Sequence, residues 1–330
     1  MSLTVLVTGA SGFVGSHLAQ ALVDAGHTVR AMTRNPDRYS GAGEAVRGDV
    51  SDPASLTSAL SGVDAAYYLV HSLDDDDFER KDAEAARAFC GAAEQAGLER
   101  IIYLGGLGRE GQDLSTHLRS RREVEHLLAE GPVPVTVLRA AIVIGHGGIS
   151  WEITRQLVAH LPAMVVPQWA TTKTQPIALR DIISYLVGVL EPVAARGRVF
   201  EVGGPEVLTY AEMMNRVARI HHHRPLPMLK VPLLTPRLSS HWLSLVTDVD
   251  TATARNLVDS MSNEVIVHDH AIDDVVPARP MGYNDAVREA FAQREQAQAE
   301  AVSTSVTSDS QCEDSRGVSS GTLSMGSGRW

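Results

Sequence analysis

Apolar and polar positions follow two different periods along the first half of the chain. Short runs rich in Val, Ile, Leu and Ala are typical of strands buried on both faces. Longer segments with apolar residues three or four positions apart are typical of helices. The predicted strands cover residues 3–7, 28–33, 45–50, 64–70, 100–104 and 132–144, and the predicted helices cover 17–23, 53–60, 76–96 and 115–130. This alternation predicts an α/β fold, a doubly wound parallel sheet with helices on both faces.

The alternation becomes irregular after residue 150, which predicts insertions that form a small C-terminal cap. Asp181 and Thr209 are of the residue types that cap helix N-termini, so each is expected to begin a helix. The helices expected here cover 150–160, 181–190 and 210–221, and short strands are expected at 164–167 and 198–203.

The segment from 225 to 246 is apolar, interrupted by prolines and contains Trp242. One interpretation is that it packs the cap against the first domain. The other is that it lines or covers a pocket for a lipophilic substrate, or faces a membrane or a partner. The sequence leaves both open.

A glycine-rich turn separates the first strand from the first helix. Residues 8–15 read TGASGFVG, with glycines at 9, 12 and 15. Gly9 permits a tight turn, Gly12 lets the backbone approach a diphosphate, and Gly15 lets the helix pack close to the strand. The first-turn N–H groups lie at the positive end of the helix dipole and bind phosphates. The turn predicts a dinucleotide site formed by Gly9, Ala10, Ser11, Gly12, Phe13, Val14 and Gly15.

This turn resembles the motif of atypical and extended short-chain dehydrogenases/reductases. The resemblance covers about residues 3–290 and is to the NmrA-like and nucleoside-diphosphate-sugar-epimerase-like branch, whose fold is an NAD(P)-binding Rossmann domain. It implies a first domain over 1–150 that binds NAD(P), with the remaining sheet elements and a substrate cap over 151–300. The tail from 301 to 330 is rich in Ser, Gly and Thr and is expected to be disordered, because few apolar residues offset its ordering entropy.

Residues at the ends of the second, third and fourth strands bear on the cofactor. The acid that binds ribose hydroxyls in NAD enzymes is replaced by Thr33-Arg34-Asn35, so Arg34, with Arg38 as a possible second, favours NADP(H) over NAD(H). The resemblance implies that Asp49 and Val50 contact the adenine ring; Asp49 also fits a cap of the next helix. His71 leaves the fourth strand where such sheets bind ligands, which predicts a place in the cofactor pocket.

The helix over 115–130 is where the resemblance places the catalytic residues. Typical members have Tyr-x-x-x-Lys there, but this chain has His117 and Arg121 at that spacing, and Gly105 or Gly106 replaces the usual serine. His117 is a candidate general acid, because imidazole titrates near neutral pH. Arg121 is a candidate for holding ribose hydroxyls but not for a base. The alternative is a pocket that only binds nucleotide.

Composition excludes several classes of function. The formal net charge of −11 argues against a nucleic-acid partner, which requires a basic surface. Two cysteines do not make a disulfide framework. The first predicted strand begins at residue 3, so we expect no signal peptide. No apolar run is long enough to span a membrane, and we expect a cytoplasmic protein. The carboxylates at 74–77 and the histidines at 221–223, 268 and 270 lack a convincing metal-ligand arrangement, so we expect no metal.

The function indicated by the resemblance and the residues is an NADP(H)-dependent oxidoreductase acting on a small carbonyl or conjugated substrate. A second hypothesis is a non-catalytic NADP(H) sensor or scaffold, as in NmrA-like regulators and a complex I accessory subunit. A third, nucleotide-sugar epimerase or dehydratase chemistry, is weakened by the missing tyrosine. The substrate and the oligomeric state do not follow from the sequence.

Overall fold

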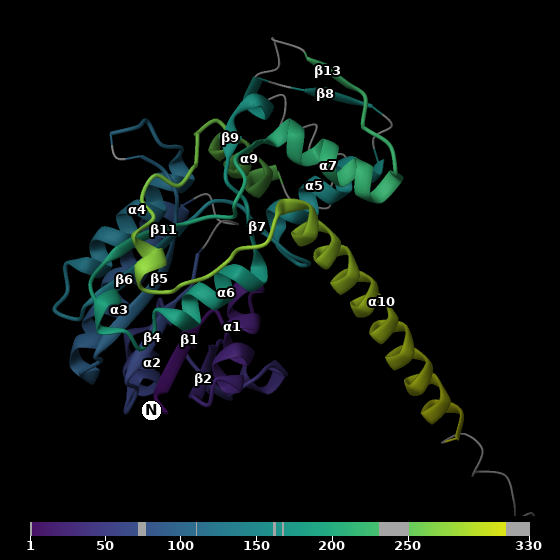
Figure 1. Cartoon of the computed structure of the whole chain (residues 1–330). Coiled ribbons are helices and arrows are strands. Elements are labelled where there is room, and N and C mark those ends of the chain that lie inside the picture. The colour runs from purple at the N-terminus through teal and green to yellow at the C-terminus, as the bar shows by residue number, and fades with distance from the viewer. Residues whose placement is uncertain are drawn as a thin grey trace, which may run out of the picture.

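The computed structural model describes residues 2–71, 77–109, 111–160, 163–166, 168–230 and 251–314. Within them, seven parallel strands form one sheet in the order β11-β6-β5-β4-β1-β2-β3 (Figure 1). The strands are β1 Thr4–Thr8, β2 Thr28–Thr33, β3 Glu44–Arg47, β4 Ala65–Tyr68, β5 Arg100–Gly106, β6 Val135–Ala140 and β11 Val199–Val202. The strand order reverses between β1 and β4, and ligands bind at the carboxyl ends of strands beside such a switch point. The predicted doubly wound parallel sheet is confirmed.

Alternate side chains of the central strands face two separate apolar clusters. In β1, Val5 and Val7 face one cluster and Leu6 the other, and all three are fully buried. Each such side chain contributes roughly 1.5–3 kcal/mol through removal from water. One face is covered by α1 (Phe13–Asp24) and α6 (Leu179–Gly188), and the other by α2 (Pro53–Leu60), α3 (Phe78–Ala96) and α4 (Thr116–Ala129).

The single strand predicted over 132–144 is wrong, because the chain forms two strands there. β6 ends at Ala140, where its pairing with β5 also ends. The following β7 (Val143–Ile144) pairs in parallel with β10 (Ile177–Ala178), outside the large sheet. Both strands are largely buried, so an unbroken apolar run covers the break between them.

The two predicted caps in the second half have different outcomes. Thr209 caps α7 (Tyr210–His222) in a capping box with Glu212, as predicted. The prediction for Asp181 is wrong, because α6 begins earlier, with Ala178 at its N-cap position. The Asp181 carboxylate instead accepts the Met281 amide at 2.8 Å, and burial raises its pKa.

The C-terminal elements pack around another apolar cluster beyond the carboxyl edge of the sheet. Trp151 and Tyr210 are buried in that cluster. Figure 1 shows α10 leaving this region and extending away from the rest of the molecule. The helix ends at Asp314, so it includes the first part of the segment 301–330 for which disorder is predicted. The elements are α5 Ile149–His160, α7, α9 Thr251–Ser260 and α10 Tyr283–Asp314, with the strand pairs β7–β10, β9 Lys173–Thr174 with β12 Leu208–Thr209, and β8 Met164–Val166 with β13 Met228–Lys230.

Several sequence predictions lie outside the described residues. They concern residues 74–76 of the acidic run, most of the apolar segment 225–246, and the tail from 315 to 330.

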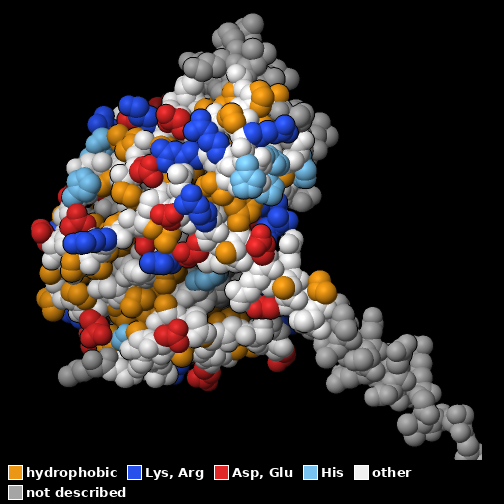
Figure 2. Space-filling model, turned by 45° about the vertical axis from the view of Figure 1, so that its right-hand side comes forward, with side chains coloured by type: hydrophobic (Ala, Val, Ile, Leu, Met, Phe, Trp, Pro, Cys, Tyr) orange, Lys and Arg blue, Asp and Glu red, His pale blue; other side chains and the backbone are white. Residues whose placement is uncertain are grey.

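In the part of the chain that is described, no helix is long and apolar enough to cross a membrane. No group of three or more His, Cys, Asp or Glu side chains there is arranged to hold a metal ion. Acidic and basic side chains are interspersed over the face seen in Figure 2.

Candidate functional site

The turn between β1 and α1 is a close-packed glycine loop. Gly9 has a φ of +64°, a conformation that residues with a side chain rarely adopt. A Cβ on Gly15 would lie 2.2 Å from the carbonyl oxygen of Gly9, so α1 approaches β1 this closely only with glycine there. Gly12 occupies the N-cap position of α1 and is exposed.

This loop fits a dinucleotide diphosphate. The first N–H groups of a helix have no intrahelical acceptor, and Gly12 offers no side chain to bond them. Ala10 is buried beneath the loop, whereas Ser11 is exposed beside Gly12. An anion at this position would meet backbone N–H groups and the positive end of the helix dipole.

Arg34 and Asp49 follow β2 and β3 on one side of the glycine loop. Arg34 is exposed, and Asp49 is half-buried. The pKa of Asp49 is lowered, chiefly because the Ser51 amide donates to its carboxylate and to a lesser extent because of the Arg34 charge. The alternative role of Asp49 as a helix cap is wrong, since the Asp52 carboxylate accepts the Ala54 amide at the start of α2. Val50 packs against the apolar cluster under α2 and α3.

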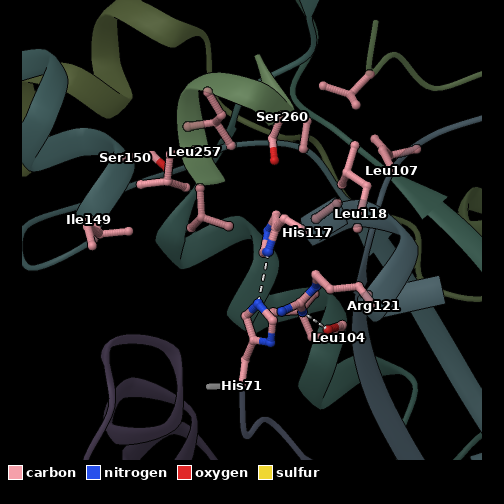
Figure 3. A pocket seen from close by; sticks show the side chains of 18 of the residues that line it. His71, Leu104, Leu107, His117, Leu118, Arg121, Ile149, Ser150, Leu257 and Ser260 are labelled. Atoms are coloured by element: carbon pink, nitrogen blue, oxygen red, sulfur yellow. Dashed lines mark hydrogen bonds between the residues drawn. The ribbon is translucent and has the colours of Figure 1, made fainter. Parts of the chain in front are cut away.

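A cavity of about 230 Å³ lies on the other side of the loop, over the ends of β5 and β6. Figure 3 shows α9 closing it from one side through Leu257 and Ser260, with Ile149 and Ser150 at another wall. Its lining is largely aliphatic and includes Leu107, Leu118, Ile142, Ile149, Leu257 and Met261.

Phe13 belongs both to the glycine loop and to the wall of this cavity. The loop that follows β7 presses against the Phe13 ring. A Cβ on Gly148 would lie 2.7 Å from Phe13 Cε1, and a Cβ on Gly145 would lie 3.1 Å from Phe13 Cζ. Glycines at 145 and 148 therefore let the two loops meet.

Three side chains from three elements form a hydrogen-bonded row that reaches the cavity. Asp82 of α3 accepts from Nδ1 of His71, which follows β4, at 2.5 Å. Nε2 of His71 lies 2.9 Å from Nδ1 of His117 on α4, the bond drawn in Figure 3. Only 11% of the His71 side chain and 4% of the Asp82 side chain are exposed, so water screens this row little.

Burial holds the pKa of His117 well below its ordinary value, and the neighbouring His71 and Arg121 add to the effect. Desolvation and nearby positive charge both disfavour the imidazolium form. His117 is therefore a neutral ring at physiological pH, one face of which lines the cavity.

Arg121 also lines the cavity, but its guanidinium is partly engaged. It donates to the carbonyl oxygen of Leu104 and lies 5.8 Å from the ring centroid of Tyr103. A Cβ on Gly106 would lie 2.9 Å from Leu118, so Gly106, one of the two glycines expected in place of the usual serine, also makes room for α4.

The structure thus divides the predicted residues between two places. Phe13, Val14, His71, His117 and Arg121 line one cavity. Arg34, Asp49 and Val50 lie at the ends of β2 and β3, where the adenosine half of a dinucleotide would extend.

Sequence reasoning missed Asp82 and the α9 residues of the cavity wall. Asp82 carries a readable signal, because it falls on the buried stripe of α3 between Phe78 and Phe89, at a position expected to be apolar. A buried carboxylate there requires a partner. The α9 residues carry no comparable signal, since tertiary packing alone brings them to the strand ends.

A parallel sheet of this order, with a glycine loop at its switch point, is typical of proteins that bind a dinucleotide. A family model described as NAD(P)H-binding matches residues 9–157. The chain is 30% identical over 227 residues to a (4-alkanoyl-5-oxo-2,5-dihydrofuran-3-yl)methyl phosphate reductase of Streptomyces griseus, covering 66% of this chain and 73% of that protein. It is 26% identical over 253 residues to a ceramide reductase of Caulobacter vibrioides, covering 73% and 78%.

Among solved structures, the Citrobacter sp. triphenylmethane reductase complexed with NADP(H) matches with a TM-score of 0.72 at 16% identity, covering 87% of this chain and 99% of that one. That likeness shows the shared fold. The chain belongs to the atypical short-chain dehydrogenase/reductase family of NAD(P)H-binding Rossmann proteins.

Proposed function

We propose that the chain is an NADP(H)-dependent reductase of a small, largely apolar carbonyl or conjugated substrate. One observation carries the proposal: a half-buried histidine, His117, lines an aliphatic cavity whose wall includes Phe13 of the glycine loop. A nicotinamide bound at that loop would face the same cavity, because open α/β sheets bind ligands across these strand ends.

In this proposal His117 and Arg121, which both line the cavity, have separate tasks. Bound NADPH supplies a hydride. Nδ1 of His117 is bonded to His71, so Nε2 is the nitrogen that donates a proton to the substrate oxygen. Arg121 holds ribose hydroxyls and stays charged, because a guanidinium does not deprotonate. The aliphatic walls exclude water and strengthen these interactions.

The aliphatic lining is the reason for proposing an apolar substrate. Leu107, Ile142 and Met261 present no hydrogen-bonding groups to a ligand. One curated relative is named for a substrate with an alkanoyl group and the other for ceramide. We therefore expect the carbonyl or conjugated group to carry an aliphatic substituent.

The test is NADPH oxidation by the purified protein against ketones, enones and quinones of increasing alkyl length. We expect turnover with the more apolar members, and His117→Ala should lower kcat about 100-fold while leaving the Kd for NADPH unchanged. His126→Gln is the matched control, because His126 is exposed on the same helix. NADPH binding without turnover across the panel would instead support a nucleotide-sensing or scaffold role.

We further propose that Arg34 selects NADP(H) by pairing with the 2′-phosphate. Arg34→Gln should weaken NADPH binding about 10- to 100-fold, the loss of one or two charge-assisted hydrogen bonds, and leave NADH binding unchanged. Calorimetric titration with both cofactors measures this. Arg87→Gln, which changes an exposed arginine of α3, should alter neither. Equal losses for NADPH and NADH would contradict a phosphate-specific role.

A further inference from the structure

The row formed by Asp82, His71 and His117 has a direction that follows from its hydrogen bonds. The Asp82 carboxylate only accepts, so His71 must donate from Nδ1. When His71 is neutral, its Nε2 carries a lone pair and must accept from Nδ1–H of His117. Nε2 of His117 is then an acceptor. One proton added to His71 reverses the hydrogen bond between the two histidines. His71 then donates from Nε2 and His117 accepts at Nδ1, so Nε2 of His117 carries the proton of that ring and becomes a donor.

The surroundings favour placing the added charge on His71 rather than on His117. His71 faces the Asp82 carboxylate, to which Ser120 also donates at 3.3 Å, and its ring packs edge-on against Phe78. His117 faces Arg121 instead, and burial, His71 and Arg121 together lower its pKa. A positive charge beside Asp82 is stabilised, whereas the same charge beside Arg121 is not.

The geometry points to Asp82, His71 and His117 as a proton relay that ends at the cavity, an inference that rests on the proposed reduction. As the hydride reaches the substrate carbon, the carbonyl π pair moves to oxygen and takes the proton from Nε2 of His117. Nδ1 of His117 takes the proton from Nε2 of His71, and His71 becomes neutral while still donating to Asp82. The carbonyl is reduced to an alcohol, NADPH is oxidised to NADP⁺, and one proton from solvent recharges the row after product release.

In this relay His117 touches the substrate, and His71 and Asp82 are positioning residues. The row takes the place of the Tyr-x-x-x-Lys pair, which the chain lacks. Its members come from α3, the segment that follows β4, and α4, so the relay exists only in the folded protein.

The first test uses the free protein, with neither cofactor nor substrate. Magnetic resonance of isotope-labelled histidine ring nitrogens reports which nitrogen of His117 carries its proton, and loss of the signal in His117→Gln assigns it. We expect the wild type at mildly alkaline pH to carry the proton on Nδ1. Asp82→Asn should reduce the fraction of His117 that carries its proton on Nδ1. The reason is that an amide donates as well as accepts, so it no longer fixes which nitrogen of His71 is protonated.

His126→Gln is the control and should leave the His117 signals unchanged. If His117 of the wild type carries its proton on Nε2 at mildly alkaline pH, the relay is overturned. The wild-type spectrum therefore tests the relay even when Asp82→Asn does not fold. An unchanged His117 tautomer in a folded Asp82→Asn variant overturns it as well.

The second test uses a substrate that the wild type reduces. Asp82→Asn should lower kcat tenfold or more, with the KM for NADPH within about twofold of wild type, since the relay acts on proton transfer and not on binding. An unchanged kcat overturns the relay and leaves the proposed reductase standing. A wild type that reduces no carbonyl overturns both.

Discussion

At the scale of single residues, surroundings decide the chemistry of His117. In water an imidazole titrates near neutral pH, but here burial, His71 and Arg121 all lower the pKa of this ring. The protein therefore keeps His117 neutral in the folded state at a pH where the unfolded chain begins to protonate it.

This difference predicts a pH dependence of stability. As pH falls through about 6.5, the unfolded state binds a proton at His117 that the folded state does not, so the wild type loses stability on acidification. Relative to His117→Gln, the free energy of unfolding should fall by up to about 1.4 kcal/mol per pH unit below that point and should not change above about pH 7. Urea denaturation at several pH values measures it. Parallel curves for the two proteins would show that His117 protonates equally in both states.

Gly15 offers a second residue-scale prediction. Gly15→Ala places a methyl group 2.2 Å from the Gly9 carbonyl oxygen, both of them backbone-fixed. We expect the free energy of unfolding to fall by about 1–3 kcal/mol and NADPH affinity to drop with it, because α1 must move away from β1. Thermal unfolding and calorimetry measure the two effects.

Gly91→Ala is the matched control for Gly15→Ala. Gly91 lies inside α3, and a Cβ there meets nothing within 4 Å. Alanine should therefore stabilise the helix by roughly 0.5–1 kcal/mol and leave NADPH binding unchanged. Equal losses of stability in both variants would show that the close contact at Gly15 is not the cause.

At the scale of elements, helix ends were predictable where the signal is local. Thr209 and Glu212 are three residues apart and satisfy each other's backbone groups, so the start of α7 follows from the sequence. Asp181 has an equally suitable side chain, but its partner is the Met281 amide, 100 positions along the chain. No local pattern reveals such a partner.

The capping box of α7 predicts a measurable loss in stability. Thr209→Ala removes the acceptor for the Glu212 amide at 3.2 Å and should lower the free energy of unfolding by about 1 kcal/mol. Thr209→Ser keeps the hydroxyl and should recover most of it. Denaturant unfolding of the three proteins provides the measurement, and a serine variant as unstable as the alanine one would contradict the capping role.

At the scale of the whole molecule, the sequence predicts the sheet and its glycine loop but not the assembled cavity. The loop is contiguous, and each glycine has a steric reason that reads directly from its spacing. The hydrogen-bonded row joins positions 71, 82 and 117, so its existence depends on the packing of α3 against α4 and on the end of β4. The sequence identifies His71 by its place after a strand and His117 by its helix spacing, and only the fold brings the two together.

The position of Phe13 predicts the order in which nucleotide and substrate bind. Its ring lies between the turn that would hold the diphosphate and the loop that begins at Gly145, so the substrate chamber shares a wall with the nucleotide cradle. A diphosphate bound in the cradle would hold that wall in place, so we expect the nucleotide to bind before the substrate. Initial-rate kinetics should therefore show a compulsory sequence through a ternary complex, with the nucleotide first on and last off. The oxidised nucleotide should inhibit competitively with respect to NADPH and not with respect to the substrate.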